Sequence, residues 1–197
     1  AMEERLNFLS FYDLLTELPN RSLFIDRLGQ AIARAEYKER VVAVILLDID
    51  RFKYLNDVFG MVAGDEILRV LSKRIGEAIR EGDTLARSGS DEFALILTDI
   101  ARQDDLILMA EKLRNIISEP VSINDKEIVL TASMGISLCP EDGDDARVLL
   151  QNADIAMARA KNQGNTYRFY TTDLNEKAYE FLTMETLLRN AIAVDEF

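Results

Sequence analysis

The sequence contains no histidine and no tryptophan, and its single cysteine is Cys139. Without histidine the chain cannot build a histidine-based catalytic triad, an imidazole metal site or the most common general base for neutral pH. One cysteine excludes a disulfide framework and a thiolate-bound metal cluster within the chain, and it favours a reducing, cytoplasmic setting. Any chemistry must therefore rest on carboxylates, lysines and a metal ion held by oxygen atoms.

Long apolar runs are also absent, and acidic residues outnumber basic ones. No stretch approaches the roughly 20 apolar residues of a membrane-spanning helix, and no signal peptide is visible, so we expect no membrane contact by this segment. The chain has 35 Asp and Glu against 23 Lys and Arg, a formal net charge of -12. This charge disfavours binding to a nucleic acid polymer. A ligand that carries phosphate would need a metal ion or a local pocket of positive charge.

The chain has 197 residues, of which 48% are hydrophobic, and this is enough for one substantial core. Apolar residues recur at helical spacing in four segments, and strand-length apolar runs lie between them. The expected helices cover about 24–38, 63–79, 106–117 and 149–160; the expected strands lie at 41–47, in a hairpin at 85–97, and at 121–123, 127–137 and 167–169. This order predicts an α/β (α+β) fold with a sheet of mixed direction flanked by helices.

The hairpin expected at Leu85–Leu97 carries two adjacent acids at its tip, Asp91 and Glu92. Its two apolar runs are joined by a small polar turn, in which Gly89 can supply a positive φ. Adjacent residues of an extended chain point to opposite faces, so the two carboxylates should have different neighbours. Acids in turns are commonly only solvated, so the hairpin alone does not assign them a function.

Two further acids, Asp48 and Asp50, follow the strand expected at 41–47, whose continuous apolar run is typical of a strand buried on both faces. If the hairpin pairs beside this strand, Asp91 or Glu92 comes close to Asp48. Carboxylates without histidine make a hard oxygen site, which suits Mg²⁺ bound together with a substrate phosphate. The alternative is that the two aspartates merely terminate the strand, and the residues alone do not decide between these interpretations.

A second set of polar residues, Lys53, Asn56, Asp65 and Lys161, suggests nucleotide binding. Asn56 and Asp65 offer the donors and acceptors that match the edge of guanine. Lys161 could contact a phosphate as a point charge. Taken singly, Asn56 and Asp65 are as well explained as loop and helix-start residues, and Lys161 as a cation favoured at a helix C-terminus.

Six separated motifs occur in order between residues 13 and about 170. They are Asp13-x-Leu-Thr-x-Leu-Pro-Asn-Arg21, Asp48-Ile-Asp-x-Phe-Lys-x-x-Asn-Asp57, Gly60-x-x-x-Gly-Asp65, Arg87-x-Gly-x-Asp-Glu-Phe93, Ser133-x-Gly-Ile136 and Ala153-Asp-x-Ala…Ala-Lys161. Together they closely resemble the GGDEF family, the diguanylate cyclase domains. The resemblance implies a fold similar to the adenylyl-cyclase catalytic palm with a central five-stranded sheet. It also implies a reaction in which a homodimer condenses two GTP into cyclic di-GMP and two pyrophosphates.

The resemblance also implies roles for the acids and their neighbours. Asp48, the Ile49 carbonyl and Asp91 resemble the ligands of Mg²⁺ (or Mn²⁺). Asp91 is also the candidate that helps to deprotonate the attacking 3′-hydroxyl. Glu92 is a second catalytic candidate and a candidate further ligand.

Substrate and product contacts are implied in the same way for residues outside the metal site. The candidates for contact with GTP are Lys53, Asn56, Asp65, Gly89, Ser90 and Lys161, where Asn56 and Asp65 would read guanine and the lysines would contact phosphate. Arg80 and Asp83 resemble an inhibitory site that binds the product cyclic di-GMP, and arginine suits a bidentate grip on guanine or phosphate. A helix-end salt bridge is the alternative for this pair.

Several positions depart from the family pattern, and Ser90 matters most because it replaces the second glycine of the signature. A Cβ there narrows the approach of a ligand to the backbone, although the hydroxyl could donate to phosphate. Met61 replaces a usual histidine and Asn165 a usual arginine, which removes one cationic phosphate contact. Glu17 and Ala158 are further departures. The metal acids survive, so GTP–Mg²⁺ binding is better supported than fast turnover.

The ends of the chain flank the predicted domain at 13–170. Residues 1–12 are expected to form a lead-in helix or linker, and 171–197 a connector helix that resembles the one leading into an EAL phosphodiesterase domain. Whether the whole protein is attached to a membrane stays open. Two functions follow from these features: a weakly active diguanylate cyclase, or a catalytically impaired module that binds GTP or cyclic di-GMP and controls an attached EAL domain. A purely structural dimerisation role would leave the retained acids unexplained.

Overall fold

The computed structural model describes residues 10–38 and 40–170, so the predicted connector at 171–197 and most of the predicted lead-in lie outside the described residues. The helices are α2 (Arg21–Lys38), α3 (Phe52–Phe59), α4 (Met61–Ala78), α5 (Gln103–Ser118) and α6 (Ala146–Lys161). The strands are β1 (Val41–Ile49), β2 (Thr84–Arg87), β3 (Glu92–Ile100), β4 (Val121–Ile123), β5 (Lys126–Ile128), β6 (Ala132–Cys139) and β7 (Tyr167–Phe169).

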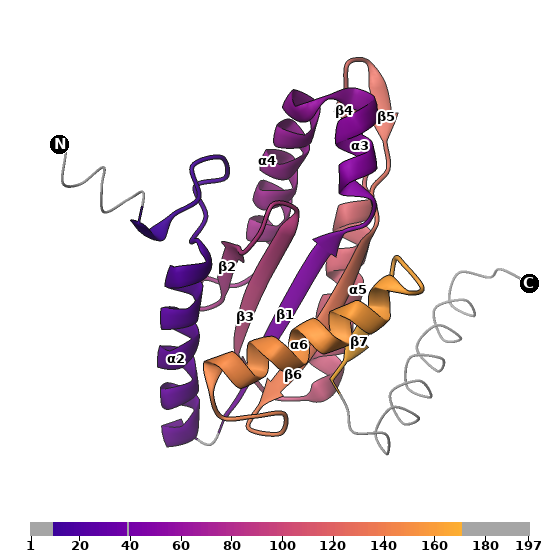
Figure 1. The fold of residues 1–197 in the computed structure, drawn as a ribbon. Coiled ribbons are helices and arrows are strands. Elements are labelled where there is room, and N and C mark those ends of the chain that lie inside the picture. The colour runs from indigo at the N-terminus through magenta and orange to yellow at the C-terminus, as the bar shows by residue number, and fades with distance from the viewer. Residues whose placement is uncertain (1–9, 39, 171–197) are drawn as a thin grey trace, which may run out of the picture.

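The main sheet has five strands in the order β2-β3-β1-β6-β7 (Figure 1). Strand β1 pairs antiparallel with both β3 and β6, β2 pairs antiparallel with β3, and β7 runs parallel to β6. The predicted five-stranded mixed sheet flanked by helices is therefore confirmed. Because β1 is central and buried from Val42 to Leu47, it needs apolar side chains on both faces, and its sequence supplies them.

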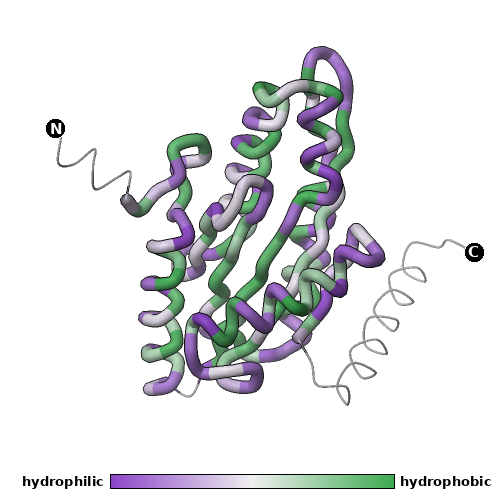
Figure 2. The backbone as a smooth tube through the Cα atoms, viewed as in Figure 1, coloured by the Kyte–Doolittle hydropathy of each residue, from purple (hydrophilic) through white to green (hydrophobic). Residues whose placement is uncertain are grey.

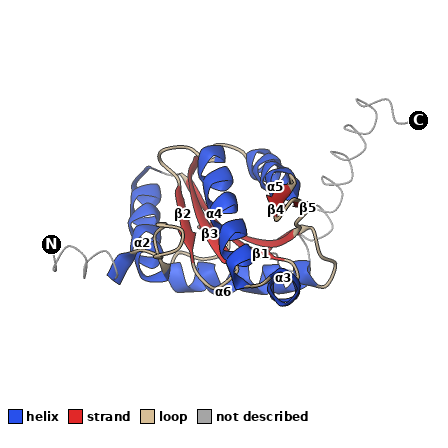
Figure 3. Ribbon diagram, turned by 90° about the horizontal axis from the view of Figure 1, so that it is seen from above, coloured by secondary structure: helices blue, strands red, loops and turns tan. Residues whose placement is uncertain are grey.

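Helices cover the two faces of this sheet. Figure 3 shows α4 and α5 on one side and α6 on the other. On the side of α2 and α6, Phe24, Leu28 and Leu149 pack with the even-numbered residues of β1, such as Val44. On the opposite side, the odd-numbered residues of β1, such as Ile45, pack against α4 and α5. The tube in Figure 2 is coloured hydrophobic along the central strands, as this two-sided burial requires.

Two segments differ from the elements expected from sequence. Residues 52–59, which carried no expected element, form α3, with Phe52 and Leu55 buried against the rest of the core. The single strand expected at 127–137 is two strands, because β5 pairs with β4 in a separate two-stranded ribbon while β6 joins the main sheet. Asn124 and Asp125 both have positive φ, which closes the tight β4–β5 turn.

The turn of the signature hairpin also differs from expectation. Among the described residues, the glycines with positive φ are Gly60, Gly143 and Gly164, so Gly89 does not serve the turn in that way. A Cβ at position 89 would instead lie 3.2 Å from Cβ of Glu92, which is a tight contact across the turn. None of the helices in the described part of the chain is both long enough and apolar enough to cross a bilayer.

Candidate functional site

The hairpin of β2 and β3 places the signature acids directly beside β1. Asp48 and Glu92 are cross-strand partners, and the amide of Ile49 donates to the carbonyl of Asp91 over 3.1 Å. Strand β1 thus continues through Asp48, which the sequence alone places just past the strand end. The expectation that Asp91 or Glu92 lies close to Asp48 is confirmed, because the pairing register brings both beside it.

Asp48 and Lys161 form the main charge pair of this site. Nζ of Lys161, at the end of α6, lies 2.8 Å from Oδ2 of Asp48. Burial raises the pKa of Asp48, the ammonium of Lys161 opposes this rise, and the neighbouring acids add to it. Burial on its own lowers the pKa of Lys161, but the hydrogen bond to Asp48 and the negative charges nearby outweigh it, so this pKa is raised. Negative charge therefore converges at the end of β1, and one ammonium partly compensates it.

Each signature acid also accepts a hydrogen bond from a serine of the same turn. Oγ of Ser90 lies 2.7 Å from Oδ1 of Asp91, and Oγ of Ser88 lies 2.5 Å from Oε1 of Glu92. The backbone of Ser88 also donates to the carbonyl of Glu92. Both carboxylates are thus held in defined orientations by hydroxyl donors.

Arg87 anchors this turn to the start of the domain, a role that the sequence analysis did not assign to it. Its Nη1 lies 3.0 and 3.1 Å from the two carboxylate oxygens of Asp13, and its Nη2 donates to the carbonyl of Ser90 over 2.7 Å. Burial tends to raise the pKa of Asp13, but hydrogen bonds from Thr16 and Arg87 outweigh it and hold this pKa below its usual value. The sequence signal for this role is that Arg87 directly follows the apolar residues Leu85 and Ala86 of the expected hairpin. A charged side chain in a largely buried strand usually has a partner of opposite charge.

Asp50 has a different role from Asp48. Its carboxylate accepts hydrogen bonds from the hydroxyls of Thr131 and Ser133, each at 2.7 Å, and from the amide of Asn165 at 2.9 Å. These bonds fasten the segment after α6 to β1 and β6. Of the two interpretations that the sequence left open, strand termination fits Asp50, whereas Asp48 is the aspartate that meets the signature acids.

Asn56 and Asp65 lie on neighbouring helices whose close approach depends on Gly64. A Cβ at Gly64 would lie 1.9 Å from Oδ1 of Asn56 and 3.1 Å from the ring of Phe52. Within the described residues, this buried Oδ1 has no hydrogen-bond partner. Asp65 follows in the first turn of α4 and is half-buried, and Lys53 is exposed on α3. An unpartnered buried acceptor is costly unless a ligand donates to it.

A cleft of about 800 Å³ opens beside Asp48 and Lys161. It is bounded by the start of α3, the segment between β5 and β6, and the segment that follows α6; its polar lining includes Asp48, Asp50, Arg51, Lys161 and Asn165. This volume is in the range of nucleotide-sized ligands. Asp48 and Lys161 therefore face a space that a phosphate-bearing ligand can enter.

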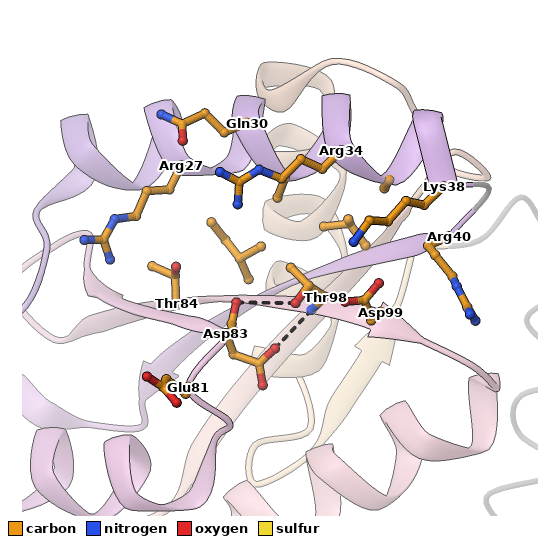
Figure 4. Close-up of a pocket in the computed structure, with 15 residues that line it drawn as sticks. Arg27, Gln30, Arg34, Lys38, Arg40, Glu81, Asp83, Thr84, Thr98 and Asp99 are labelled. Carbon is orange, nitrogen blue, oxygen red and sulfur yellow. Dashed lines mark hydrogen bonds between the residues drawn. The ribbon is translucent and has the colours of Figure 1, made fainter.

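Arg80 and Asp83 lie away from this cleft, in the turn after α4. Oδ2 of Asp83 accepts from the amide of Arg80 at 3.1 Å, and Oδ1 accepts from the amide of Thr98 at 3.0 Å. Asp83 also borders a second cavity of about 490 Å³ (Figure 4). The basic residues that line this cavity are Arg27, Arg34, Lys38 and Arg40. Asp83 thus holds the turn in place and lies across the cavity from these basic residues. Its carboxylate bonds to backbone amides instead of forming the helix-end salt bridge considered from sequence.

The residues at the end of β1 fit a magnesium ion held together with a substrate. The described residues contain no cluster of three or more acidic, histidine or cysteine side chains that could hold a metal ion by themselves. Mg²⁺ commonly takes one or two carboxylates and completes its shell with waters and substrate phosphates. The two aspartates, Asp48 and Asp91, would supply such an oxygen-only set, and Lys161 already supplies a cation to Asp48.

Comparison with known proteins gives consistent results along most of the chain. The family model for the diguanylate cyclase GGDEF domain matches residues 10–167. The bifunctional diguanylate cyclase/cyclic di-GMP phosphodiesterase MucR of Pseudomonas aeruginosa is 43% identical over 185 residues, which cover 93% of this chain and 27% of that protein. The cyclic di-GMP phosphodiesterase PdeR of Escherichia coli is 36% identical, with 98% of this chain and 29% of that protein covered. The chain thus spans less than a third of the length of either protein.

Solved structures show the same similarity in three dimensions. The GGDEF domain of TpbB (YfiN) from Pseudomonas aeruginosa matches with a TM-score of 0.79 and 36% identity, covering 85% of this chain and 98% of that one. The GGDEF domain of DgcB from Caulobacter crescentus, in complex with cyclic di-GMP, matches with a TM-score of 0.76 and 28% identity, covering 82% and 96%. With its matched residues, its five-stranded sheet and its signature hairpin, this chain belongs to the GGDEF family of diguanylate cyclase domains.

Proposed function

We propose that this domain binds GTP with Mg²⁺ or Mn²⁺ and, as a homodimer, condenses two GTP into cyclic di-GMP and two pyrophosphates. The observation that carries the proposal is that Asp48 pairs across the sheet with Glu92 of the signature hairpin and bonds to the ammonium of Lys161, while Asp48 and Lys161 line a nucleotide-sized cleft. Negative side chains brought together in this way call for a cation, and a metal ion bound with phosphates supplies it.

The residues of the site divide into two groups in this proposal. Asp48, the carbonyl of Ile49 and Asp91 would hold the metal ion, which when bound neutralises phosphate charge and acidifies a nearby hydroxyl. Asp91 would accept the proton of the attacking 3′-hydroxyl, and Glu92 would support it from the neighbouring strand position. Lys161 would contact phosphate from the end of α6.

Recognition of the base would fall to the second group, on α3 and α4. Oδ1 of Asn56, which has no hydrogen-bond partner in the part of the chain that the structure describes, can accept a hydrogen bond from guanine, and Asp65 can accept from the N–H groups of the same edge. Lys53, exposed on the first turn of α3, would add a phosphate contact. Gly89 and Ser90, in the signature turn, would lie against the substrate from the side of the hairpin.

Catalysis in this proposal requires two copies of the domain. The acids beside Lys161 would serve one GTP, and each 3′-hydroxyl must attack the α-phosphate of the other nucleotide. When two domains face each other, each 3′-hydroxyl can be positioned for attack on the α-phosphate held by the other domain. Turnover should therefore rise more steeply than linearly with protein concentration wherever the dimer is only partly formed.

The alternative is a catalytically impaired module that binds GTP or cyclic di-GMP and controls an attached EAL phosphodiesterase domain. Ser90 favours this alternative because its hydroxyl already occupies one oxygen of Asp91, and Asn165 favours it because it stands where a cationic phosphate contact would help. Relatives named as phosphodiesterases, such as PdeR and NbdA, are consistent with it. Arg80, Asp83 and the basic cavity beside them would then bind cyclic di-GMP.

Incubation of the concentrated 197-residue chain with GTP and Mg²⁺, followed by nucleotide chromatography, tests the proposal. Cyclic di-GMP should form with the natural sequence and with Asp26→Ala, which removes an exposed acid of α2, but not with Asp91→Ala. Equal product from the natural sequence and Asp91→Ala would refute the cyclase. Calorimetry with GTP–Mg²⁺ and with cyclic di-GMP separates the alternatives, because the regulatory module requires binding of at least one of them.

A further inference from the structure

The signature turn carries a hydroxyl donor for its leading acid, and this donor comes from the residue that replaces a family glycine. Oγ of Ser90 lies 2.7 Å from Oδ1 of Asp91. We infer that Ser90 is a positioning residue that weakens divalent-ion binding at Asp91, so that the metal–GTP complex binds less tightly than it would to the same turn without this hydroxyl. The inference rests on the proposed function, since it concerns the affinity of the same site.

The position of the hydroxyl follows from contacts outside the turn. The carbonyl of Ser90 accepts a hydrogen bond from Nη2 of Arg87 at 2.7 Å, and Nη1 of the same arginine is bonded to both oxygens of Asp13. The amide of Arg87 is also bonded to the carbonyl of Pro19. Because the backbone at Ser90 is anchored in this way, its hydroxyl is presented to Asp91 without a further loss of chain entropy.

The bond acts on the metal site through the charge of Asp91. A hydroxyl that donates to a carboxylate forms a strong, charge-assisted bond, which stabilises the anion and draws electron density from its oxygen. A divalent ion needs the same electron density. The bond also relieves part of the repulsion among Asp48, Asp91 and Glu92, so it stabilises the state without metal. Both effects lower the gain in free energy when the ion binds.

Removal of the hydroxyl should leave the fold intact, which makes the inference testable. Ser90 is exposed, so Ser90→Ala opens no cavity, and the contact with Arg87 is made by the backbone carbonyl and persists. If Ser90→Ala damaged the site in general, metal affinity would fall, whereas we expect metal affinity to rise. Ser90→Ala keeps the Cβ and Ser90→Gly removes it, so the pair separates the hydrogen bond from the steric effect.

The test is calorimetric titration of the preformed Mn²⁺ complex of 3′-deoxy-GTP, which lacks the attacking hydroxyl and cannot react, into the 197-residue chain. Ser90→Ala and Ser90→Gly should each lower the Kd for this complex about threefold to tenfold, the range expected when one typical solvent-exposed hydrogen bond is removed. The matched control Ser122→Ala, at an exposed position of β4, should leave the Kd unchanged. Thermal unfolding of all variants verifies that they are folded.

Each outcome bears on the inference. An unchanged or higher Kd for Ser90→Ala overturns it, and a lower Kd for Ser90→Gly alone overturns it in favour of a steric effect of the Cβ. Absence of binding of the Mn²⁺ complex of 3′-deoxy-GTP to every variant overturns both the inference and GTP–metal binding in the proposed function. Tighter binding to Ser90→Ala without cyclic di-GMP formation from GTP supports the inference and refutes only the cyclase.

Discussion

Lys161 and Asp48 are 113 residues apart in sequence, yet Nζ of the lysine lies 2.8 Å from Oδ2 of the aspartate. The contact joins the end of α6 to the end of β1, and it places a cation on the aspartate that lies beside the signature hairpin. The side chain of Asp48 is only 15% exposed, so its charge depends on this partner more than a surface carboxylate would.

We predict that Lys161→Met weakens GTP–Mg²⁺ binding at least about tenfold, because one charge-assisted phosphate contact is lost. The same change should destabilise the fold by about 1–2 kcal/mol, because it leaves the mostly buried carboxylate of Asp48 without its charged partner while water reaches the partly exposed position of the ammonium. Calorimetry and urea unfolding measure the two effects. Lys126→Met, at an exposed position of β5, is the control and should change neither. A large loss of stability without loss of binding would contradict the assignment of Lys161 to phosphate.

Arg87→Met should destabilise the fold by about 2 kcal/mol, because it leaves the half-buried carboxylate of Asp13 without its charged partner and releases the carbonyl of Ser90. Arg102→Met is a matched control, since Arg102 pairs with Asp104 at the surface and exposed pairs contribute little. Urea denaturation of both variants measures the difference. Equal effects of the two substitutions would show that the link between Asp13 and the turn contributes no more to stability than an exposed ion pair does.

Gly64→Ala should destabilise the fold and weaken GTP binding. Its Cβ would lie 1.9 Å from Oδ1 of Asn56, so α3 or the asparagine must move, at a cost of about 1–3 kcal/mol. Gly29→Ala makes the same change in the middle of α2, where no atom of residues 10–38 or 40–170 lies within 4 Å of the new Cβ, and should stabilise the fold by up to about 1 kcal/mol. Thermal unfolding and calorimetry with GTP–Mg²⁺ compare the two. Normal GTP affinity in a folded Gly64→Ala domain would argue against a role of Asn56 in base recognition.

Stability should depend on pH through Asp142. Burial raises the pKa of Asp142 to about 6; a hydrogen bond from the amide of Leu138 opposes this rise and the charge of Glu141 adds to it. A carboxyl whose pKa is higher in the folded state stabilises the fold fully below its unfolded pKa, near 3.8, and this stabilisation is lost as pH rises through about 6. Allowing for solvent screening, the loss should be below about 3 kcal/mol.

The measurement for Asp142 is the free energy of urea unfolding between pH 4 and 7, compared between the natural sequence and Asp142→Asn. The asparagine keeps an acceptor for Leu138 but does not titrate, so the decline over the window from about 4 to about 6 should flatten. Asp144→Asn, at an exposed neighbouring position, should keep the decline. The same slope in all three proteins would assign the pH dependence to other groups.

Most of the fold could be predicted because apolar periodicity is a local property. The continuous apolar runs of β1 and β3 and the apolar stripes on α2, α4, α5 and α6 reflect burial that each segment needs by itself. The sequence predictions that were wrong concern segments whose structure depends on contacts with residues distant in the sequence. Residues 127–137 contain enough strand-forming residues for one strand, but pairing with β4 separates residues 126–128 from the main sheet. The conformation of Gly89 depends on how closely the turn approaches Glu92, which the glycine alone does not reveal.

For the candidate site, the sequence reveals which residue types are present: oxygen ligands without histidine, an acid pair in a turn, and lysines that could contact phosphate. How these residues are used depends on the tertiary structure. It paired Asp48 with Lys161, assigned Asp50 to bracing the segment after α6, and bonded the hydroxyl of Ser90 to Asp91. The physical reason is that strand register and helix packing set the distances between polar atoms, and hydrogen bonds form only within a few tenths of an ångström of their preferred length.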